Sequence, residues 1–386
     1  MKNDFLLFHK PFISEDEVDE IVDTVRSGWI SMGPKTIRFE SNFSEYIGAK
    51  NSIAVSSWTA AGHLTLEAFG VKPEDEVIVP TMTFPATAEI VCYFGAKPVI
   101  VDVDEDTLNI SLEAIEKAIT PKTKVIIPVH YAGQPCDLDE IHEIARKYGL
   151  RVLEDAAHSL PADYKGKRIG TISDVTCFSF YATKTLSTGE GGMICTDDEE
   201  ITERCKIMRL HGINRDAWKR YTESGSWYYE VVAPGYKYNF TDLQASLGLP
   251  QLKKVDTMWD SRKRIAAKYT EALKDLDTIQ LHTIKPNRDS SWHLFPIRLH
   301  LDRLTINRAQ IINELREKNV GVGVHFMPVH QHQYYSQTFN LSDSDFPVAS
   351  AAFPRLLSLP IYPGMTDENV DRVIDVLIDT LNNFKK

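Results

Sequence analysis

Two stretches of the chain carry residue types suited to covalent chemistry. Asp155 ends an apolar run at residues 151–155, and Lys184 closes a segment of hydroxyl, aromatic and small residues that follows a second apolar run at 175–180. In open α/β sheets, ligands bind beyond the carboxyl ends of strands, so both side chains are expected at one edge of a sheet. Partial burial there lowers the basicity of a lysine and frees its amine as a nucleophile, as a Schiff-base lysine requires.

A carboxylate beside such a lysine is the partner that a protonated pyridine nitrogen needs. Pyridoxal phosphate works as an electron sink only when that ring nitrogen keeps its proton. Asp155 and Lys184 therefore form a candidate pyridoxal phosphate site. The structural alternative is that Asp155 caps the next helix and Lys184 is a solvated loop residue, since both residue types are common in those places.

A phosphate site would support the first interpretation. The motif Ser57-Trp-Thr-Ala-Ala61 leads from a short apolar strand into a helix, so the amides of Thr59 and Ala60 are expected to face an anion. Ser179 offers a further hydroxyl, and Phe84 at another strand end could stack on a flat ring. Taken singly, the motif is also an ordinary helix N-cap and the aromatic residue is also an ordinary core residue.

Two other kinds of site are disfavoured. The motif Gly189-Glu-Gly-Gly192 is not a dinucleotide fingerprint, because a strand follows it where the fingerprint needs a helix. Three histidines, His325, His330 and His332, lie close together in the chain, but no nearby carboxylate motif completes a metal site. A satisfied core or surface histidine is at least as good an interpretation of each one.

Alternating strands and helices must position these residues. Short apolar runs near residues 77–79, 99–103, 125–127, 151–155, 175–180 and 192–195 alternate with helical patterns, which predicts a mostly parallel sheet with helices on both faces. The runs are continuously apolar, as is typical of strands buried on both faces. A first helix is expected at 14–26, where Ser14 and Glu17 form a capping box.

The pattern changes towards the C-terminus. Thr241 and Gln244 cap a helix that continues to Leu252, and a separate charged helix is expected over 256–276. Strands at 293–299 and 320–325, a helix at 307–318 and a C-terminal helix after Thr366 follow. The sequence thus predicts a large α/β domain over residues 1–250 and a smaller α+β domain over residues 251–386.

Composition narrows the class of protein. With 386 residues, 43% of them apolar and 25% charged, the chain has the makeup of a folded globular protein. Its net charge of −11 disfavours nucleic acid and membrane partners. The five cysteines include no C-x-x-C pair, and no apolar run approaches a membrane span, so we expect a cytoplasmic protein with reduced thiols.

The motifs together resemble the pyridoxal-phosphate-dependent nucleotide-sugar aminotransferases of the DegT/DnrJ/EryC1/StrS family. The resemblance spans the chain and rests on these segments: Ser57-Trp-Thr-Ala-Ala61, Glu154-Asp-Ala-Ala-His158, Ser179-Phe-Tyr-Ala-Thr-Lys184, Gly189-Glu-Gly-Gly192 and Gly235-Tyr-Lys-Tyr-Asn239. It implies the fold type I architecture of aspartate aminotransferase, with a mostly parallel central sheet and a smaller C-terminal α+β domain.

The resemblance also implies roles for single residues. Lys184 matches the lysine that links covalently to the cofactor, Asp155 the partner of the pyridinium nitrogen, and His158 the position beside the ring hydroxyl. Other cofactor-binding positions are matched by Phe84, which would stack on the ring, and by Thr59, Ala60, Ser179 and Asn239, which would hold the phosphate. Asn239 would act from the neighbouring subunit, which implies a homodimer with shared active sites.

Two departures from the family pattern are visible. Trp58 stands where a small residue is common, and we expect its indole to point into the core. Lys237 and Asn239 occupy positions where the family often has Asn and Arg, so either one is a candidate for the phosphate ligand from the neighbouring subunit.

Substrate contacts are expected from Trp29, Ile30, His325 and Tyr335. No metal is expected.

The implied activity is amino transfer from L-glutamate, released as 2-oxoglutarate, to a nucleotide-linked keto-deoxysugar, with C4 as the favoured position. The products would serve polysaccharide, lipopolysaccharide or secondary-metabolite sugar biosynthesis. The alternatives are a sugar 3-aminotransferase, a dehydratase of the same family and a non-catalytic ligand-binding regulator. The family's dehydratases replace the linking lysine with histidine, and Lys184 therefore argues against that alternative.

Overall fold

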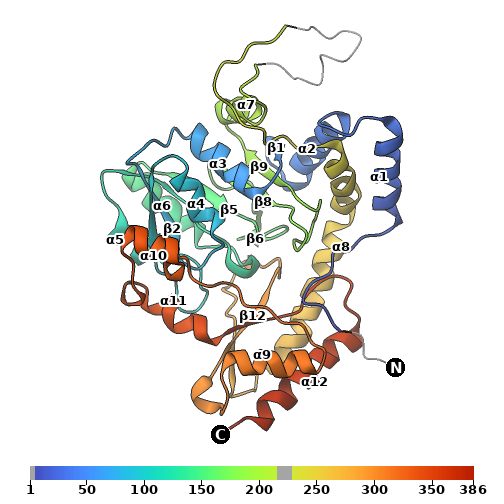
Figure 1. Ribbon diagram of the computed structural model, residues 1–386, viewed down its shortest axis with the longest axis vertical. Helices are drawn as coiled ribbons and strands as arrows, with labels where there is room; N and C mark the ends of the chain where they lie inside the picture. The colour runs from blue at the N-terminus through green and yellow to red at the C-terminus, as the bar shows by residue number, and fades with distance from the viewer. Residues whose placement is uncertain (1–4, 215–227) are drawn as a thin grey trace.

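A computed structural model describes residues 5–214 and 228–386 (Figure 1). Its centre is a seven-stranded sheet in which β9 alone runs antiparallel to its neighbours. In spatial order the strands are β1 (Asn51–Val55), β9 (Gly192–Thr196), β8 (Val175–Ser179), β5 (Arg151–Asp155), β4 (Thr123–Ile126), β2 (Glu76–Pro80) and β3 (Lys97–Val101). The predicted α/β class with a mostly parallel central sheet is confirmed.

Helices cover both faces of this sheet because successive side chains of each strand point to opposite sides. On β5, Leu153 belongs to a core shared with α3 and α4, whereas Val152 belongs to a core shared with α2 and α6. The helices up to α7 are α1 (Glu15–Ser27), α2 (Pro34–Ile47), α3 (Trp58–Ala68), α4 (Ala86–Cys92), α5 (Leu112–Ala118), α6 (Leu138–Tyr148) and α7 (Glu199–Met208). The capping box of Ser14 and Glu17 is confirmed.

A third core belongs to the C-terminal part of the chain, at the lower end of the view in Figure 1. It packs a three-stranded antiparallel sheet against helices. The elements are β10 (Ile279–Leu281), β12 (Phe295–Leu299), β13 (Leu356–Leu359), α9 (Arg308–Glu317) and α12 (Asp367–Asn383). A second small sheet comprises β6 (Asp163–Tyr164), β7 (Lys167–Arg168) and β11 (Arg288–Asp289).

The long helix α8 (Asp242–Leu273) connects these parts. The sequence predicts two helices here, and that prediction is wrong: one 32-residue helix continues through Pro250. Its first half packs in the core of the large sheet through Leu249 and Val255, and its second half packs in the third core through Ile265 and Tyr269. Burial on successive faces compensates for the hydrogen bond that a proline removes from a helix.

Two further features bear on the predicted division at residue 250. That boundary lies inside α8, which runs across it without a break. Helices α10 (Gln333–Phe339) and α11 (Pro347–Ala352), although late in the chain, pack on the core of the large sheet. The division into residues 1–250 and 251–386 stays a prediction.

The segment 320–325 differs from the predicted strand. It makes two isolated bridges, Leu6 with Val320 and Gly323 with Ser358 of β13, and forms no continuous strand. The segment divides its backbone hydrogen bonds between the N-terminal segment and β13, so no run of consecutive residues pairs with one strand. Among the described helices, none combines the length and the apolar character needed to cross a bilayer.

Candidate active site

A cavity of about 530 Å³ lies where the strands β5 and β8 end. Seven residues expected from the sequence line it: Thr59, Phe84, Asp155, His158, Ser179, Lys184 and His325. The carboxyl ends of parallel neighbours meet at one edge of a sheet, which is why segments 155–158 and 179–184 converge there. The N-terminal segment adds Phe8 and His9, and the segment before β12 adds His293.

Asp155 is buried at the end of β5 and is held by two donors. The backbone N–H of Ala157 donates to Oδ1 at 3.0 Å, and the Thr87 hydroxyl donates to Oδ2 at 2.9 Å. Burial raises the pKa of Asp155 to about 6, although both hydrogen bonds and the Lys184 cation favour the carboxylate. The carboxylate is thus fixed in orientation and responds to the charge of whatever it faces.

Lys184 follows β8 and extends its partly buried side chain into the cavity. Burial lowers the pKa of its ammonium to about 8, against the opposing attraction of Asp155 and with a further lowering by Arg262. The Nζ atom lies 3.5 Å from Nε2 of His293. A lysine with this pKa supplies both the ammonium and the neutral amine near neutral pH, as an acid–base residue must.

The N-terminus of α3 borders the cavity at the place where the sequence predicts an anion site. Ser57 caps the helix and accepts the Ala60 amide on its hydroxyl at 3.0 Å. Ala60 is therefore engaged by the cap and does not line the cavity, unlike Ser57 and Thr59. Gly192 on β9 packs so closely that an added Cβ would lie 2.5 Å from the Ser57 carbonyl oxygen. This close approach explains a glycine at that position.

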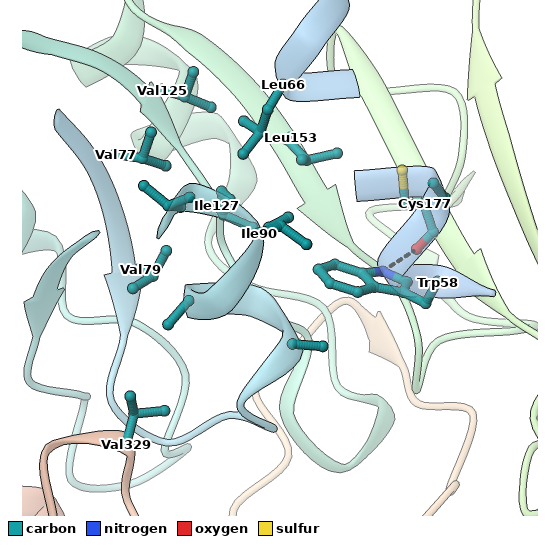
Figure 2. Close-up of a cluster of buried hydrophobic side chains, with 14 of the residues drawn as sticks. Trp58, Leu66, Val77, Val79, Ile90, Val125, Ile127, Leu153, Cys177 and Val329 are labelled. Carbon is teal, nitrogen blue, oxygen red and sulfur yellow. Dashed lines mark hydrogen bonds between the residues drawn. The ribbon is translucent and has the colours of Figure 1, made fainter. Parts of the chain in front are cut away.

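Trp58 lies next to this turn, and its indole packs into the core as expected (Figure 2). Only 6% of the residue is exposed, and Nε1 donates to the carbonyl oxygen of Cys177 at 3.1 Å. The hydrogen bond joins the start of α3 to β8. Trp58 therefore stabilises the turn at Ser57 from the core side, and it also contributes to the cavity wall.

The residues of the cavity fit pyridoxal phosphate. Phe84 is 60% exposed and offers an uncovered ring to the cavity, as a stacking residue would. The buried Nδ1 of His158 has no hydrogen-bond partner within the described residues, which suits a position beside the hydroxyl of the cofactor ring. Burial, and after it the Lys184 cation, holds the pKa of His158 well below its usual range, so this ring is neutral.

Besides Ala60, four expected residues lie outside the cavity of their own chain. The Trp29 indole donates to the Met32 carbonyl oxygen at 3.2 Å, and Ile30 is half exposed. Tyr335 is buried beside a separate hollow, and Asn239 donates to the Phe240 carbonyl oxygen. None of these four lines the cavity that holds Lys184.

The three clustered histidines separate in space. His325 lines the cavity, stacks on Phe8 and is bonded through Nδ1 to the Ser358 hydroxyl at 3.0 Å. His330 is buried against the hydroxyl of Thr81, and His332 borders the separate hollow. Within the described ranges, no group of His, Cys, Asp or Glu side chains is arranged to hold a metal ion.

Sequence reasoning missed several residues of the cavity. Thr87 follows Phe84 by three positions on one face of a helical turn, a spacing that could have revealed it. Nothing in the local sequence marks His9 or His293, because each reaches the cavity from a distant part of the chain.

Comparison with known proteins shows which family the chain belongs to. Residues 11–378 match the DegT/DnrJ/EryC1/StrS aminotransferase family. The spore coat polysaccharide biosynthesis protein SpsC of Bacillus subtilis is 46% identical over 379 residues, which are 98% of this chain and 97% of SpsC. The fold is similar to that of Spr1654 of Streptococcus pneumoniae, described as a sugar aminotransferase and solved in its pyridoxamine phosphate form. The TM-score is 0.92 at 36% identity, over 98% and 99% of the two chains.

The aminotransferase PseC of Helicobacter pylori, involved in pseudoaminic acid biosynthesis, is similar over 98% of this chain and all of its own, with a TM-score of 0.91 at 28% identity. The fold and the site thus define a pyridoxal-phosphate-dependent aminotransferase of fold type I. The chain belongs to the DegT/DnrJ/EryC1/StrS aminotransferase family.

The pKa of Lys184 makes a prediction about cofactor uptake. Only the neutral amine attacks an aldehyde, so the rate at which the apoprotein links pyridoxal phosphate should rise with pH and level off above about 8. In Asp155→Asn, the midpoint should move to lower pH, because the carboxylate that favours the ammonium is gone. Stopped-flow absorbance between about pH 6 and about pH 10 measures both profiles. An unshifted midpoint in the variant would show that Asp155 does not act on Lys184.

Proposed function

We propose that this enzyme transfers the amino group of L-glutamate to a nucleotide-linked keto-deoxysugar, at C4 of the sugar. The observation that carries the proposal is the convergence of Lys184 and Asp155 in one cavity of a chain of this family. SpsC takes part in spore coat polysaccharide biosynthesis, and PseC in pseudoaminic acid biosynthesis. By analogy, we assign the product to the biosynthesis of a polysaccharide or of a related surface or secondary-metabolite sugar.

Each residue of the site has a task in this reaction. Bound pyridoxal phosphate supplies the electron sink. Asp155, held by Thr87 and the Ala157 amide, keeps the ring nitrogen protonated, and the hydroxyls at the start of α3 bind the phosphate. Lys184 would be the acid–base residue that removes the proton from Cα of the donor, and it would move the proton in the opposite direction for the sugar. A ping-pong sequence with 2-oxoglutarate as the first product follows.

The visible absorption spectrum of the purified protein tests the donor. A yellow band is expected with pyridoxal phosphate, and L-glutamate should bleach it to the pyridoxamine form with release of 2-oxoglutarate. Nucleotide sugars with a keto group at C4 or at C3 should then restore the band, and the faster isomer identifies the position. A band that L-glutamate leaves unchanged would reject this donor. Failure of every keto sugar to restore the band would reject the acceptor class.

The charged residues of the cavity lining support a proposal about assembly. Among the described residues that line the cavity, Lys184 is the single lysine and there is no arginine, so a bound phosphate lacks a fixed cation. Lys237 and Asn239 lie outside the cavity of their own chain. We therefore propose a homodimer in which Lys237 or Asn239 of each chain reaches the phosphate of the other.

An uncovered apolar face supports this proposal. Helix α1 packs on α8 with its polar side, on which Glu17 is buried and paired with Lys254. Its apolar stripe, Val18, Val22 and Val25, points outward and is 38–57% exposed. Ile30 and Ile37, which follow α1 in the chain, are also exposed. Such a face on a helix is typical of an interface, and a second copy of this chain would cover it.

Val22→Asp should therefore convert the dimer into a monomer, because a charge would be buried without a partner. Sedimentation at micromolar concentrations measures the assembly. Tyr148→Asp is the control, since Tyr148 is a comparably exposed apolar residue on α6, away from α1 (Figure 1). A monomeric wild type, or a dimer that Val22→Asp leaves intact, would contradict the assignment of this face.

A further inference from the structure

His293 contacts the Lys184 amine from a distant part of the chain. It lies just before β12, and its Nε2 is 3.5 Å from Lys184 Nζ. Within residues 5–214 and 228–386, this is the hydrogen-bonding contact found for that amine. Two other imidazoles of the cavity wall bond elsewhere: His9 through Nε2 with the Ala182 carbonyl oxygen, and His325 through Nδ1 with Ser358. The third, His158, has no partner for Nδ1 among the described residues.

The backbone around His293 is fixed independently of Lys184. The N–H of Ser291 donates to the Gly133 carbonyl oxygen at 3.2 Å, and the Ser291 hydroxyl donates to the His158 carbonyl oxygen. Gly133 has a φ of 103°, and an added Cβ would lie 2.0 Å from the Ser291 hydroxyl oxygen, so only glycine permits this approach. The segment that carries His293 is therefore a rigid support.

Arg262 supports the same segment from the other side. This fully buried guanidinium donates through Nη1 to the carbonyl oxygens of Trp292, His293 and Ile361, at 3.1, 3.3 and 2.8 Å. Its hydrogen bonds tie α8 to two parts of the cavity wall, since His293 and Ile361 both line the cavity. A buried arginine bonded to three carbonyl oxygens fixes their relative positions.

Burial keeps the His293 ring neutral. Burial, and after it the Lys184 cation, holds the pKa of His293 well below its usual range. The other groups that act on the ring are His158, Arg262 and His9, and none of them is an anion. A neutral imidazole has one nitrogen that accepts and one that donates, so Nε2 can bond to Lys184 as an ammonium or as an amine. It cannot itself supply the proton for the reaction near neutral pH.

We propose that His293 is a positioning residue that holds the Lys184 amine in the cavity whenever that amine is not covalently linked. The proposal rests on the proposed function, in which the amine is released during each half-reaction. A lysine has a flexible four-carbon stem, so a released amine needs a fixed partner to stay aimed at the reacting carbon. His158 packs against the His293 ring at 4.4 Å between centroids and limits its movement.

Kinetics of the glutamate half-reaction provide the first test. His293→Phe keeps the ring volume and removes both nitrogens. We expect kcat to fall by ~100-fold, the size of effect that a misplaced catalytic group produces. KM for L-glutamate should stay unchanged, and the isotope effect with α-deuterated glutamate should rise because proton transfer becomes slower. His293→Gln, whose amide can still reach Lys184, should recover most of the activity. A raised KM with an unchanged isotope effect would overturn the proposal.

Cofactor capture provides a second test that needs no turnover. The apoprotein of His293→Phe should form its yellow covalent form with pyridoxal phosphate more slowly than the wild type. In a Lys184→Ala background, adding His293→Phe should leave the affinity for pyridoxal phosphate unchanged, as equilibrium dialysis measures. A weaker affinity in that background would show that His293 contacts the cofactor directly, and would contradict a role for His293 in positioning Lys184. This result is independent of the amino donor, so failure of the proposed function does not obscure it.

Discussion

Lys184→Ala is expected to slow the glutamate half-reaction by ~10⁴-fold or more, the upper end of what a positioned acid–base residue contributes. The variant should still bind pyridoxal phosphate, because Asp155, Phe84 and the turn at Ser57 remain in place. No yellow covalent form should appear, since the linking amine is missing. Single-turnover absorbance with preloaded cofactor and a large excess of L-glutamate measures the loss.

The control for this variant is Lys165→Ala, which removes an exposed lysine that pairs with Asp139 and does not line the cavity. Its turnover should equal that of the wild type. Small primary amines should restore part of the activity to Lys184→Ala, because they can occupy the space of the missing side chain and carry protons. Full activity of Lys184→Ala without added amine would remove Lys184 from the reaction.

Asp155→Asn is expected to lower kcat by ~10²–10³-fold, the effect of removing one electrostatic group that stabilises a transition state. The asparagine oxygen can still accept from the Ala157 amide, and its NH2 can donate to the Thr87 hydroxyl, which can turn to donate to Thr83, so the geometry should survive. What is lost is the negative charge that keeps the ring nitrogen of the cofactor protonated. Steady-state kinetics and the position of the absorption band report the two effects.

Asp163→Asn is the matched control for Asp155→Asn. Asp163 is also an aspartate whose pKa burial raises, but it pairs with Arg168 outside the cavity. Its replacement should leave the absorption band unchanged. If both aspartate variants lose activity equally, the loss in Asp155→Asn would reflect altered folding and not the charge at the ring nitrogen.

The chemical centre of this site could be predicted because its residues lie at strand ends that the sequence marks. Asp155, Ser179 and Lys184 each follow an apolar run, and parallel strands deliver such positions to one edge. His293 could not be predicted in this way, because 109 residues separate it from Lys184 and no local pattern links them. Its place depends on tertiary contacts, including those of Gly133 and Arg262.

The fold shows the same division between local and tertiary information. The strands of the large sheet were predictable because burial on both faces leaves continuous apolar runs. Helix α8 was not, since Pro250 and the charged residues after it suggest a break that packing in two cores overrides. Helix α1 also differs from the general pattern in which a helix buries its apolar side in its own chain, because its apolar stripe of Val18, Val22 and Val25 is exposed.

The continuity of α8 limits how this chain can be taken apart. Its first half supplies Leu249 and Val255 to one core, and its second half supplies Ile265 and Tyr269 to another. A cut at residue 250 would leave each fragment with a frayed half-helix and an exposed apolar seam. Fragments cut at this point should therefore complement each other poorly. A chimaera with the C-terminal part of a relative should fold only if the exchanged segment includes the whole of α8.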